Sequence, residues 1–193
     1  MRVIGGSAKG RRLHATRAAS MRPTTDTARR TIFDILGDAP RDAHVLDLFA
    51  GAGTLGIEAA SRGARDITFV DHDRDACAVL LRNLETTGVR ERAVIRRADV
   101  VRFLSRTPRT PYDLVFLDPP YGAGLEFMAL VLGKLAGRGW VAPGGTVVAE
   151  AEVGRIEWPP WFREIRTRRF GRTQVSVAVR DAGRASSDLP GDL

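Results

Sequence analysis

Four short apolar runs in this sequence each end in or beside an aspartate, and helical patterns separate them. The runs cover residues 44–49, 67–70, 94–96 and 112–117, and the aspartates are Asp47, Asp71, Asp99 and Asp118. Strand-like runs that alternate with helical periodicity predict βαβ units and a mostly parallel sheet. The carboxyl ends of such strands share one edge, where ligands of open α/β sheets bind. We therefore expect the four aspartates to form a site at that edge.

The rest of the chain predicts further helices and three more strands. Helices are expected from residues 24–26 to Leu36, up to about Arg62, between Asp73 and Gly88, and at 125–135. A fifth strand is expected at 146–149. Residues 162–170 and 173–179 are expected to pair as an antiparallel hairpin, because a two-residue connection is too short for a crossover. Residues 2–4 and 11–14 flank a glycine-rich turn and predict a small hairpin.

These elements predict an α/β fold with a seven-stranded, mostly parallel sheet, a C-terminal antiparallel hairpin and a small N-terminal extension. We divide the 193 residues into a basic N-terminal hairpin and helix (1–36), a main domain (37–180) and a disordered polar tail (181–193).

The charge is unevenly distributed and points to a nucleic-acid partner. The formal net charge is +7, and arginine supplies nearly all of the positive charge, since Lys9 and Lys134 are the only lysines. Residues 1–30 contain a single acid, Asp26, among many basic residues, and a second basic run lies at 163–172. Arginine binds phosphates in bidentate fashion, so we expect Arg11 and Arg12 to contact the nucleic acid. Heavy arginine use in a GC-rich genome is the alternative.

Cysteine content and hydropathy limit the setting of the chain. Cys77 is the only cysteine, which excludes an internal disulfide and favours a reducing, cytoplasmic location. No apolar run reaches about 18 residues, so no membrane span is expected. The histidines have no partners at metal-ligand spacing, and we expect no metal.

The sequence from Gly51 to Gly56 matches the pattern G-x-G-x-x-G, which alone is a weak sign of a dinucleotide site. Asp47 precedes these glycines and would repel a pyrophosphate, and no basic residue stands in the loop. An acid there suits a cationic group, such as the ammonium of an amino acid. Asp71 can accept both hydroxyls of a ribose, and Asp99 can accept the exocyclic amine of adenine. The set predicts S-adenosylmethionine, although each acid alone could equally be a helix cap or a solvated turn.

The fourth run ends in the sequence Asp118-Pro119-Pro120-Tyr121. Asp118 and the carbonyl of Pro119 can both accept hydrogen bonds from one amino group, and the prolines fix the backbone and offer no competing N–H. Tyr121 can stack on a base. The arrangement predicts methyl transfer to the exocyclic amine of a nucleobase, achieved mainly by positioning. For this box alone, a rigid turn after a strand is the alternative.

These motifs resemble those of class I, Rossmann-like S-adenosylmethionine-dependent methyltransferases. More narrowly, the chain resembles the RsmD family, which methylates guanine N2 in bacterial 16S ribosomal RNA. The matching stretches are RVIGGSAKGRRL, RPTTDTARRTIFDIL, VLDLFAGAGTLGIEAASRGA, FVDHD, ADV and FLDPPY. The D-P-P-Y box is shared with DNA adenine-N6 enzymes, whereas the N-terminal stretch followed by R-P-T is particular to this family. After Leu125 the chain departs from the pattern, and we transfer no RNA contacts into that part.

The resemblance implies a role for each matching residue. Arg22 and Thr24 belong to an entry segment that touches RNA or closes over the cofactor, and Glu58 lies in the cofactor block without a defined role. The implied catalytic residues are Asp118, Pro119, Pro120 and Tyr121. The implied cofactor-binding residues are Asp47, Phe49, Gly51, Gly53, Asp71, His72, Asp99, Val100 and Asp118.

The implied partner is 16S ribosomal RNA within 30S subunits or their assembly intermediates, in the cytoplasm. Three alternatives stay open. The first is an adenine-N6 nucleic-acid methyltransferase and the second is a methyltransferase acting on a protein amide. The third is a non-catalytic RNA-binding module on the same fold.

Overall fold

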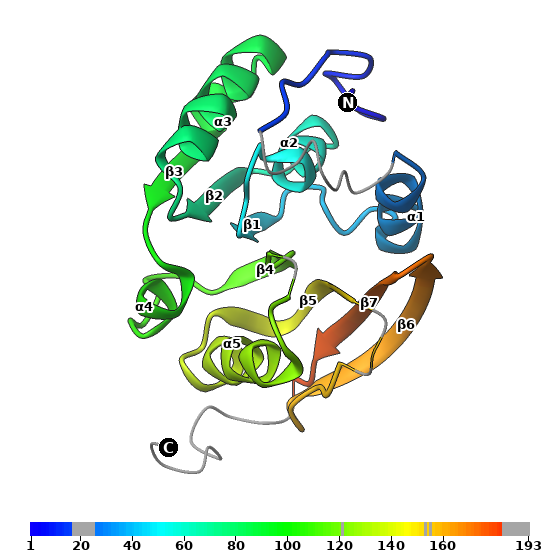
Figure 1. The fold of residues 1–193 in the computed structure, drawn as a ribbon, viewed down its shortest axis with the longest axis vertical. Helices are drawn as coiled ribbons and strands as arrows, with labels where there is room; N and C mark the ends of the chain where they lie inside the picture. The colour runs from blue at the N-terminus through cyan, green and yellow to red at the C-terminus, as the bar shows by residue number, and fades with distance from the viewer. Residues whose placement is uncertain (17–25, 121, 153, 155, 183–193) are drawn as a thin grey trace.

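The computed structural model describes residues 1–16, 26–120, 122–152, 154 and 156–182. Its centre is one seven-stranded sheet with the strand order β3-β2-β1-β4-β5-β7-β6 (Figure 1). All neighbours from β3 to β5 are parallel, and β7 is antiparallel to both β5 and β6. The strands are β1 (His44–Leu48), β2 (Asp66–Asp71), β3 (Ala93–Arg97), β4 (Tyr112–Leu117), β5 (Val141–Glu152), β6 (Phe162–Phe170) and β7 (Thr173–Arg180).

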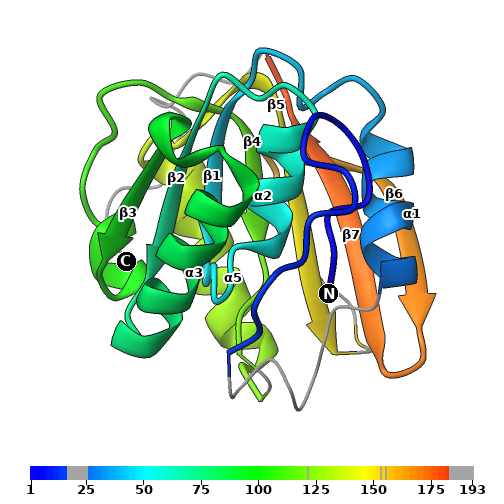
Figure 2. The same cartoon turned by 90° about the horizontal axis from the view of Figure 1, so that it is seen from above.

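Helices cover both faces of the sheet. Figures 1 and 2 show α1, α2, α3 and the N-terminal segment on one face, and α4 and α5 on the other. Each face has its own buried apolar cluster, one around Phe33, Ile57 and Leu84 and the other around Leu104 and Val131. The helices are α1 (Asp26–Leu36), α2 (Thr54–Ser61), α3 (Arg74–Thr87), the 3-10 turn η1 (Arg90–Arg92), α4 (Val100–Leu104) and α5 (Leu125–Gly137).

The structure confirms the predicted sheet, with a mostly parallel body and a C-terminal antiparallel hairpin. β4 has the predicted bounds, and β6 and β7 lie within one residue of theirs. Both predicted caps of α3 are present: the side chain of Asp73 accepts a hydrogen bond from the Ala76 N–H at 2.8 Å, and Gly88 has φ 74°.

Two predictions about local structure were wrong or incomplete. The fifth strand was predicted at 146–149 but runs from Val141 to Glu152. The strand contains an irregularity, where the register shifts between the pairs Tyr112–Val141 and Leu114–Thr146. The short helix α4 was not predicted; its N-cap is Asp99, whose carboxylate accepts from the Arg102 N–H.

The N-terminal hairpin is present and packs onto α2. Arg2 and Arg12 form an antiparallel bridge, and Val3 and Leu13 are buried in the same cluster as α2. The Glu58 side chain, which is fully buried, accepts from the Ile4 N–H at 2.7 Å and the Gly5 N–H at 2.8 Å. Its Oε1 atom also accepts from Nε of Arg62.

The N-terminal segment and the main part of the chain therefore share one core. The division of the chain at residue 36 stays a prediction. Most of the expected tail, residues 183–193, lies outside the described residues. Among the helices that are described, none has both the length and the apolar composition needed to span a membrane.

Replacing Glu58 with alanine should lower the free energy of unfolding by about 2–4 kcal/mol. The change leaves two backbone N–H groups and the Arg62 guanidinium without their buried acceptor. Urea unfolding followed by circular dichroism measures the effect. The control is Glu85→Ala on the exposed side of α3, which should stay within about 0.5 kcal/mol of wild type. Equal losses in the two variants would show that Glu58 does not hold the N-terminal segment.

Candidate active site

The four aspartates lie at the carboxyl ends of four neighbouring strands. Because β3, β2, β1 and β4 are adjacent in that order, the acids succeed one another across the sheet as Asp99, Asp71, Asp47 and Asp118. The amino-acid sequence predicts that these acids share an edge of the sheet. The strand order gives the order in which they follow one another along that edge. The structure thus arranges the acids in a row.

Asp47 is buried against the glycine loop and is hydrogen-bonded to Gly56 at its end. It is 2% exposed, and its Oδ2 atom accepts a hydrogen bond from the Gly56 N–H at 2.9 Å. A Cβ on Gly56 would lie 2.3 Å from a ring carbon of Phe69, so no larger residue fits without a shift. Phe49, Gly51 and Gly53 have φ values of 58°, 54° and 78°, which let the chain turn sharply from β1 into α2.

Asp71 holds the same loop from the neighbouring strand. Its Oδ2 atom accepts from the Gly51 N–H at 2.7 Å, and its Oδ1 atom accepts from the Asp73 N–H at 2.9 Å. The side chain of His72 is exposed, with its Nδ1 atom 3.7 Å from Oδ1 of Asp71. Asp71 therefore links the end of β2 to the loop after β1, at the place where a ribose ligand was predicted.

Asp99 lies on the surface at the far end of the row. It is exposed, and it is the N-cap of α4. Val100, which follows it, is buried in the cluster beneath α4 and α5. Asp99 thus has the helix-cap role that the sequence left open, and its exposure leaves the carboxylate accessible from solvent.

Asp118 follows directly on β4, the central strand, and is half-buried. Pro119 is buried and Pro120 is exposed, and the Pro120 carbonyl accepts from the Ala123 N–H at 3.1 Å. Tyr121, the last residue of the predicted catalytic box, lies outside the described residues, as do Arg22 and Thr24 of the entry segment.

The acids act on one another electrostatically. Burial raises the pKa of Asp47 well above its ordinary value, and the charges of Asp118 and Asp71 raise it further, while the hydrogen bond from Gly56 opposes them. Three carboxyl groups are therefore gathered at this edge of the sheet, and ionising all of them without a ligand is unfavourable. Such a site favours a ligand that carries positive charge and hydrogen-bond donors.

The comparisons with known proteins agree with this geometry. A family model described as conserved hypothetical protein 95, the RsmD family, matches residues 1–179. The chain belongs to the RsmD family. A relative from Escherichia coli (strain K12), "Ribosomal RNA small subunit methyltransferase D", is 37% identical over 153 residues, which are 79% of this chain and 75% of the relative. The protein of the same name from Haemophilus influenzae is 34% identical over 79% of each chain.

Solved structures confirm the fold. The structure of yhhF from Escherichia coli has a TM-score of 0.85 and 34% sequence identity, and the match covers 94% of this chain and 98% of that one. The fold is the Rossmann-like class I methyltransferase fold, as the sequence predicted. As a member of the RsmD family, the chain is a methyltransferase.

Asn83 is a residue of this RsmD-family site that sequence reasoning missed. It is fully buried on α3, and its Nδ2 atom donates to the carbonyls of His14 (3.0 Å) and Ala52 (2.9 Å), while its Oδ1 atom accepts from the His14 N–H. It therefore ties the N-terminal segment to the glycine loop. The only sign of Asn83 in the sequence is that an amide residue falls on the apolar face of the predicted helix.

The predicted RNA contacts Arg11 and Arg12 are exposed on the N-terminal hairpin. The tip of that hairpin packs against Ser61, where the Ser61 carbonyl accepts from the Ser7 N–H and its hydroxyl from the Ala8 N–H. Ser61 ends α2, and α2 begins at the glycine loop, so the tip lies away from Asp118. Whether Arg11 and Arg12 contact RNA stays a prediction.

Gly56→Ala should destabilise the protein by about 1–3 kcal/mol and weaken cofactor binding, because its methyl group would displace Phe69 and the loop. Gly133→Ala is the matched control. Gly133 also lies in a helix, and nothing lies within 4 Å of its Cβ position, so alanine there should stabilise by up to about 1 kcal/mol. Thermal unfolding of both variants checks the signs. A neutral Gly56→Ala would show that close packing of α2 on β2 is not required.

Proposed function

We propose that this protein transfers a methyl group from S-adenosylmethionine to the exocyclic N2 amine of a guanine in bacterial 16S ribosomal RNA. We also propose that its substrate is the RNA of small-subunit particles or their assembly intermediates, in the cytoplasm. The observation that carries the proposal is the row of Asp99, Asp71, Asp47 and Asp118 on adjacent strands. The names of its relatives, which are ribosomal RNA small subunit methyltransferases, support the choice of substrate.

The residues present fit the proposed cofactor. Along the row, Asp99 would accept from the adenine amine, Asp71 from the ribose hydroxyls, and Asp47 would face the cationic amino-acid part. This order follows the order of the groups within the cofactor itself. The loop from Gly51 to Gly56 contains no basic residue, so nothing in it would neutralise a pyrophosphate. Asp47 is deeply buried and accepts a hydrogen bond from Gly56, so it would act on the ligand by electrostatic attraction at a distance rather than by direct contact.

The reaction needs an exocyclic amine whose lone pair is available. Asp118 and the carbonyl of Pro119 would accept the two amine hydrogens outside the plane of the base, which favours a pyramidal nitrogen. When bound, the cofactor supplies a methyl group on a sulfonium, which is a good leaving group. The N–C bond would form as the S–C bond breaks, a neutral thioether would leave, and the methylated nitrogen would then lose a proton to Asp118 or to water. The two prolines restrict the backbone that carries these acceptors, so most of the rate enhancement would come from positioning.

The base must leave its stack to reach Asp118, which costs a few kcal/mol. Stacking on an aromatic ring offsets about 1–3 kcal/mol, and Tyr121 would be that ring.

The first test is methyl transfer from labelled S-adenosylmethionine to small ribosomal subunits from cells that lack this gene. Mass spectrometry of the labelled nucleoside should give N2-methylguanosine in 16S RNA. Labelled methyladenosine would mean that the same reaction takes place at adenine N6 instead of guanine N2. Labelled protein would indicate an amide substrate. Absence of label on subunits, free RNA, DNA and protein, with the cofactor still bound, would indicate a non-catalytic module.

In the same assay, Asp118→Ala should reduce turnover by about 10²–10⁴-fold, because the amine loses an acceptor needed in the transition state. Calorimetry should show that the variant still binds the cofactor. Asp118→Asn keeps one acceptor oxygen, and its turnover should lie between those of wild type and Asp118→Ala. Asp38→Ala, at an exposed position before β1, serves as the control. Undiminished turnover in Asp118→Ala would remove Asp118 from the mechanism.

Asp47→Asn should stabilise the ligand-free protein at neutral pH and weaken cofactor binding about tenfold or more. The folded-state pKa of Asp47 lies above its ordinary value of 3.8, so folding favours the protonated form. The stability that the protonated group contributes is lost as the pH rises from that value through the raised pKa. The free energy of unfolding of Asp47→Asn should therefore rise relative to that of wild type across this pH window. The difference should persist at higher pH.

Thermal unfolding as a function of pH measures this effect, and Asp38→Asn is the exposed control. A variant that is less stable than wild type at pH 7 would mean that the ionised carboxylate is favourable in the ligand-free fold.

A further inference from the structure

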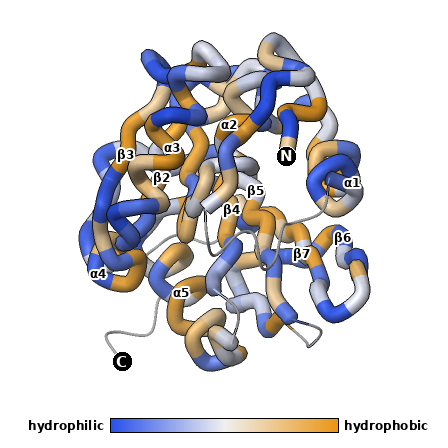
Figure 3. The backbone as a smooth tube through the Cα atoms, turned by 45° about the horizontal axis from the view of Figure 1, so that its top comes forward, coloured by the Kyte–Doolittle hydropathy of each residue, from blue (hydrophilic) through white to orange (hydrophobic). Residues whose placement is uncertain are grey.

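The outermost strand of the sheet, β6, is rich in exposed arginine. Its sequence is FREIRTRRF, and the side chains of Arg163, Arg166, Arg168 and Arg169 are exposed. Figure 3 shows the hydrophilic colours of β6 beside the more apolar β7. β6 is an edge strand, which pairs with β7 on one side and with no other described strand. These arginines belong to the second basic run of the sequence, which takes no part in the aspartate site.

The register of the sheet places these arginines relative to Asp118. Leu48 pairs with Leu117, Leu117 with Ala149, Ala149 with Ser176, and Ser176 with Thr167. Thr167 is therefore level with Leu117, the residue before Asp118. Since β6 runs in the same direction as β4, Arg168 is level with Asp118 itself. Three strand spacings separate them, or about 14 Å.

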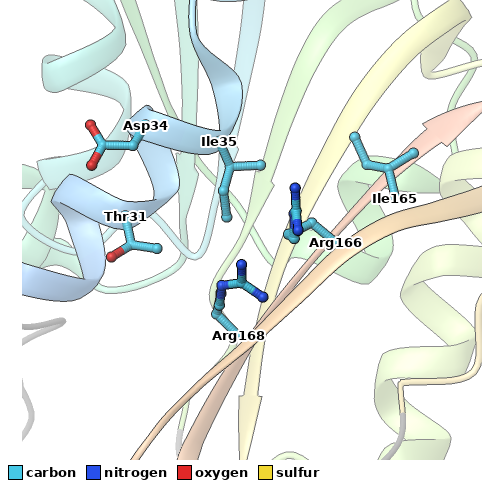
Figure 4. Close-up of a pocket in the computed structure, with 6 residues that line it drawn as sticks. All are labelled: Thr31, Asp34, Ile35, Ile165, Arg166 and Arg168. Atoms are coloured by element: carbon cyan, nitrogen blue, oxygen red, sulfur yellow. The ribbon is translucent and has the colours of Figure 1, made fainter.

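Arg166 and Arg168 also line a surface cleft. The cleft lies between α1 and β6, measures about 530 Å³, and is lined by Thr31, Asp34, Ile35, Ile165, Arg166 and Arg168. Figure 4 shows both guanidinium groups extending from β6 toward α1. Arg166 and Arg168 are two residues apart on one strand, so they share a face and lie about 7 Å apart along it.

Neither guanidinium is neutralised by an acid within the part of the chain that the structure describes. The ion pairs found there include Arg163 with Asp181 but none made by Arg166 or Arg168. The one hydrogen bond found for the Arg168 side chain goes to the carbonyl of Thr167 at 3.3 Å. Two positive charges therefore face an open cleft, and one of them, on Arg168, is level with Asp118 in the sheet.

We propose that Arg166 and Arg168 bind backbone phosphates of the ribosomal RNA strand that flanks the methylated base. The inference rests on the proposed function and adds a second RNA-binding surface to it. A base inserted at Asp118 leaves its neighbours outside the sheet edge, and a distance of about 14 Å spans a few nucleotides. Arginine is suited to this role because its planar group binds phosphate in bidentate fashion.

Another role for the same residues is protection of the open sheet edge, because charged side chains on an edge strand prevent pairing with other chains. The two roles differ in what they predict. Phosphate binding makes RNA affinity depend on these charges and on salt. Edge protection makes only the oligomeric state depend on them.

The test compares wild type with the double variant Arg166→Gln/Arg168→Gln in binding and methylating small-subunit particles. The KM for the particles should rise about tenfold, while kcat at saturation and cofactor affinity stay the same. The slope of log affinity against log salt should become shallower by about one for each phosphate that the variant no longer binds. Arg166→Lys/Arg168→Lys should recover most of the slope, because the charge is retained.

The matched control is Arg106→Gln/Arg109→Gln. These arginines are exposed in the loop before β4, at the end of the sheet opposite Asp118, and the control removes the same number of charges. Its KM and salt slope should stay close to those of wild type. Asp34→Asn should have the opposite sign and lower the KM, because Asp34 lines the facing wall of the cleft.

Three results would overturn the inference. The first is an unchanged KM and salt slope in the β6 double variant, and the second is an equal change in the control. The third is self-association of the variant in light scattering with normal RNA binding, which would assign the arginines to edge protection. In each case wild-type methylation of guanine would leave the proposed function intact. If wild type neither binds nor methylates the particles, the proposed function fails and this inference fails with it.

Discussion

One buried hydrogen bond, from the Gly56 N–H to the Asp47 carboxylate, joins α2 to the sheet. Asp47 belongs to β1, which lies beside the central strand β4, and Gly56 lies in the first turn of α2. Because Gly56 has no Cβ, the helix can approach Phe69 and the acid closely. The next turn of α2 presents Glu58 and Ser61, which bind the N-terminal hairpin. The docking of the first residues therefore depends on the same carboxylate that borders the candidate cofactor site.

The same contact lowers the cost of placing a carboxyl group in the core. Burial and the neighbouring acids raise the pKa of Asp47, so its ionised form opposes folding. Backbone N–H groups offset part of this, with Gly56 donating to Asp47 and Gly51 donating to Asp71. A cationic ligand would offset more. Sites that bind charged groups commonly trade stability for function in this way.

Sequence reasoning succeeded where local chemistry determines the structure. α3 has Asp73 and Gly88 as its caps, and β4 is bounded by a polar loop and by Asp118. It found only the middle of β5, because the strand contains a register shift between its pairs with Tyr112 and Leu114, and this depends on the neighbouring strand. It also left Glu58 without a role, because its backbone partners Ile4 and Gly5 lie more than 50 residues away. The order of the strands, and hence of the acids, likewise depends on long-range packing.

The sheet also keeps two surfaces of opposite charge apart. The acids at the ends of β1, β2 and β4 suit a cationic ligand, whereas Arg166 and Arg168 on β6 suit a polyanion. At physiological ionic strength the Debye length is about 8 Å, which is shorter than the roughly 14 Å between β4 and β6. Repulsion between the acids and a bound phosphate backbone would therefore be largely screened. Because β5 and β7 are buried strands with a fixed register, they set this separation, and a shift in either would move the basic strand relative to Asp118.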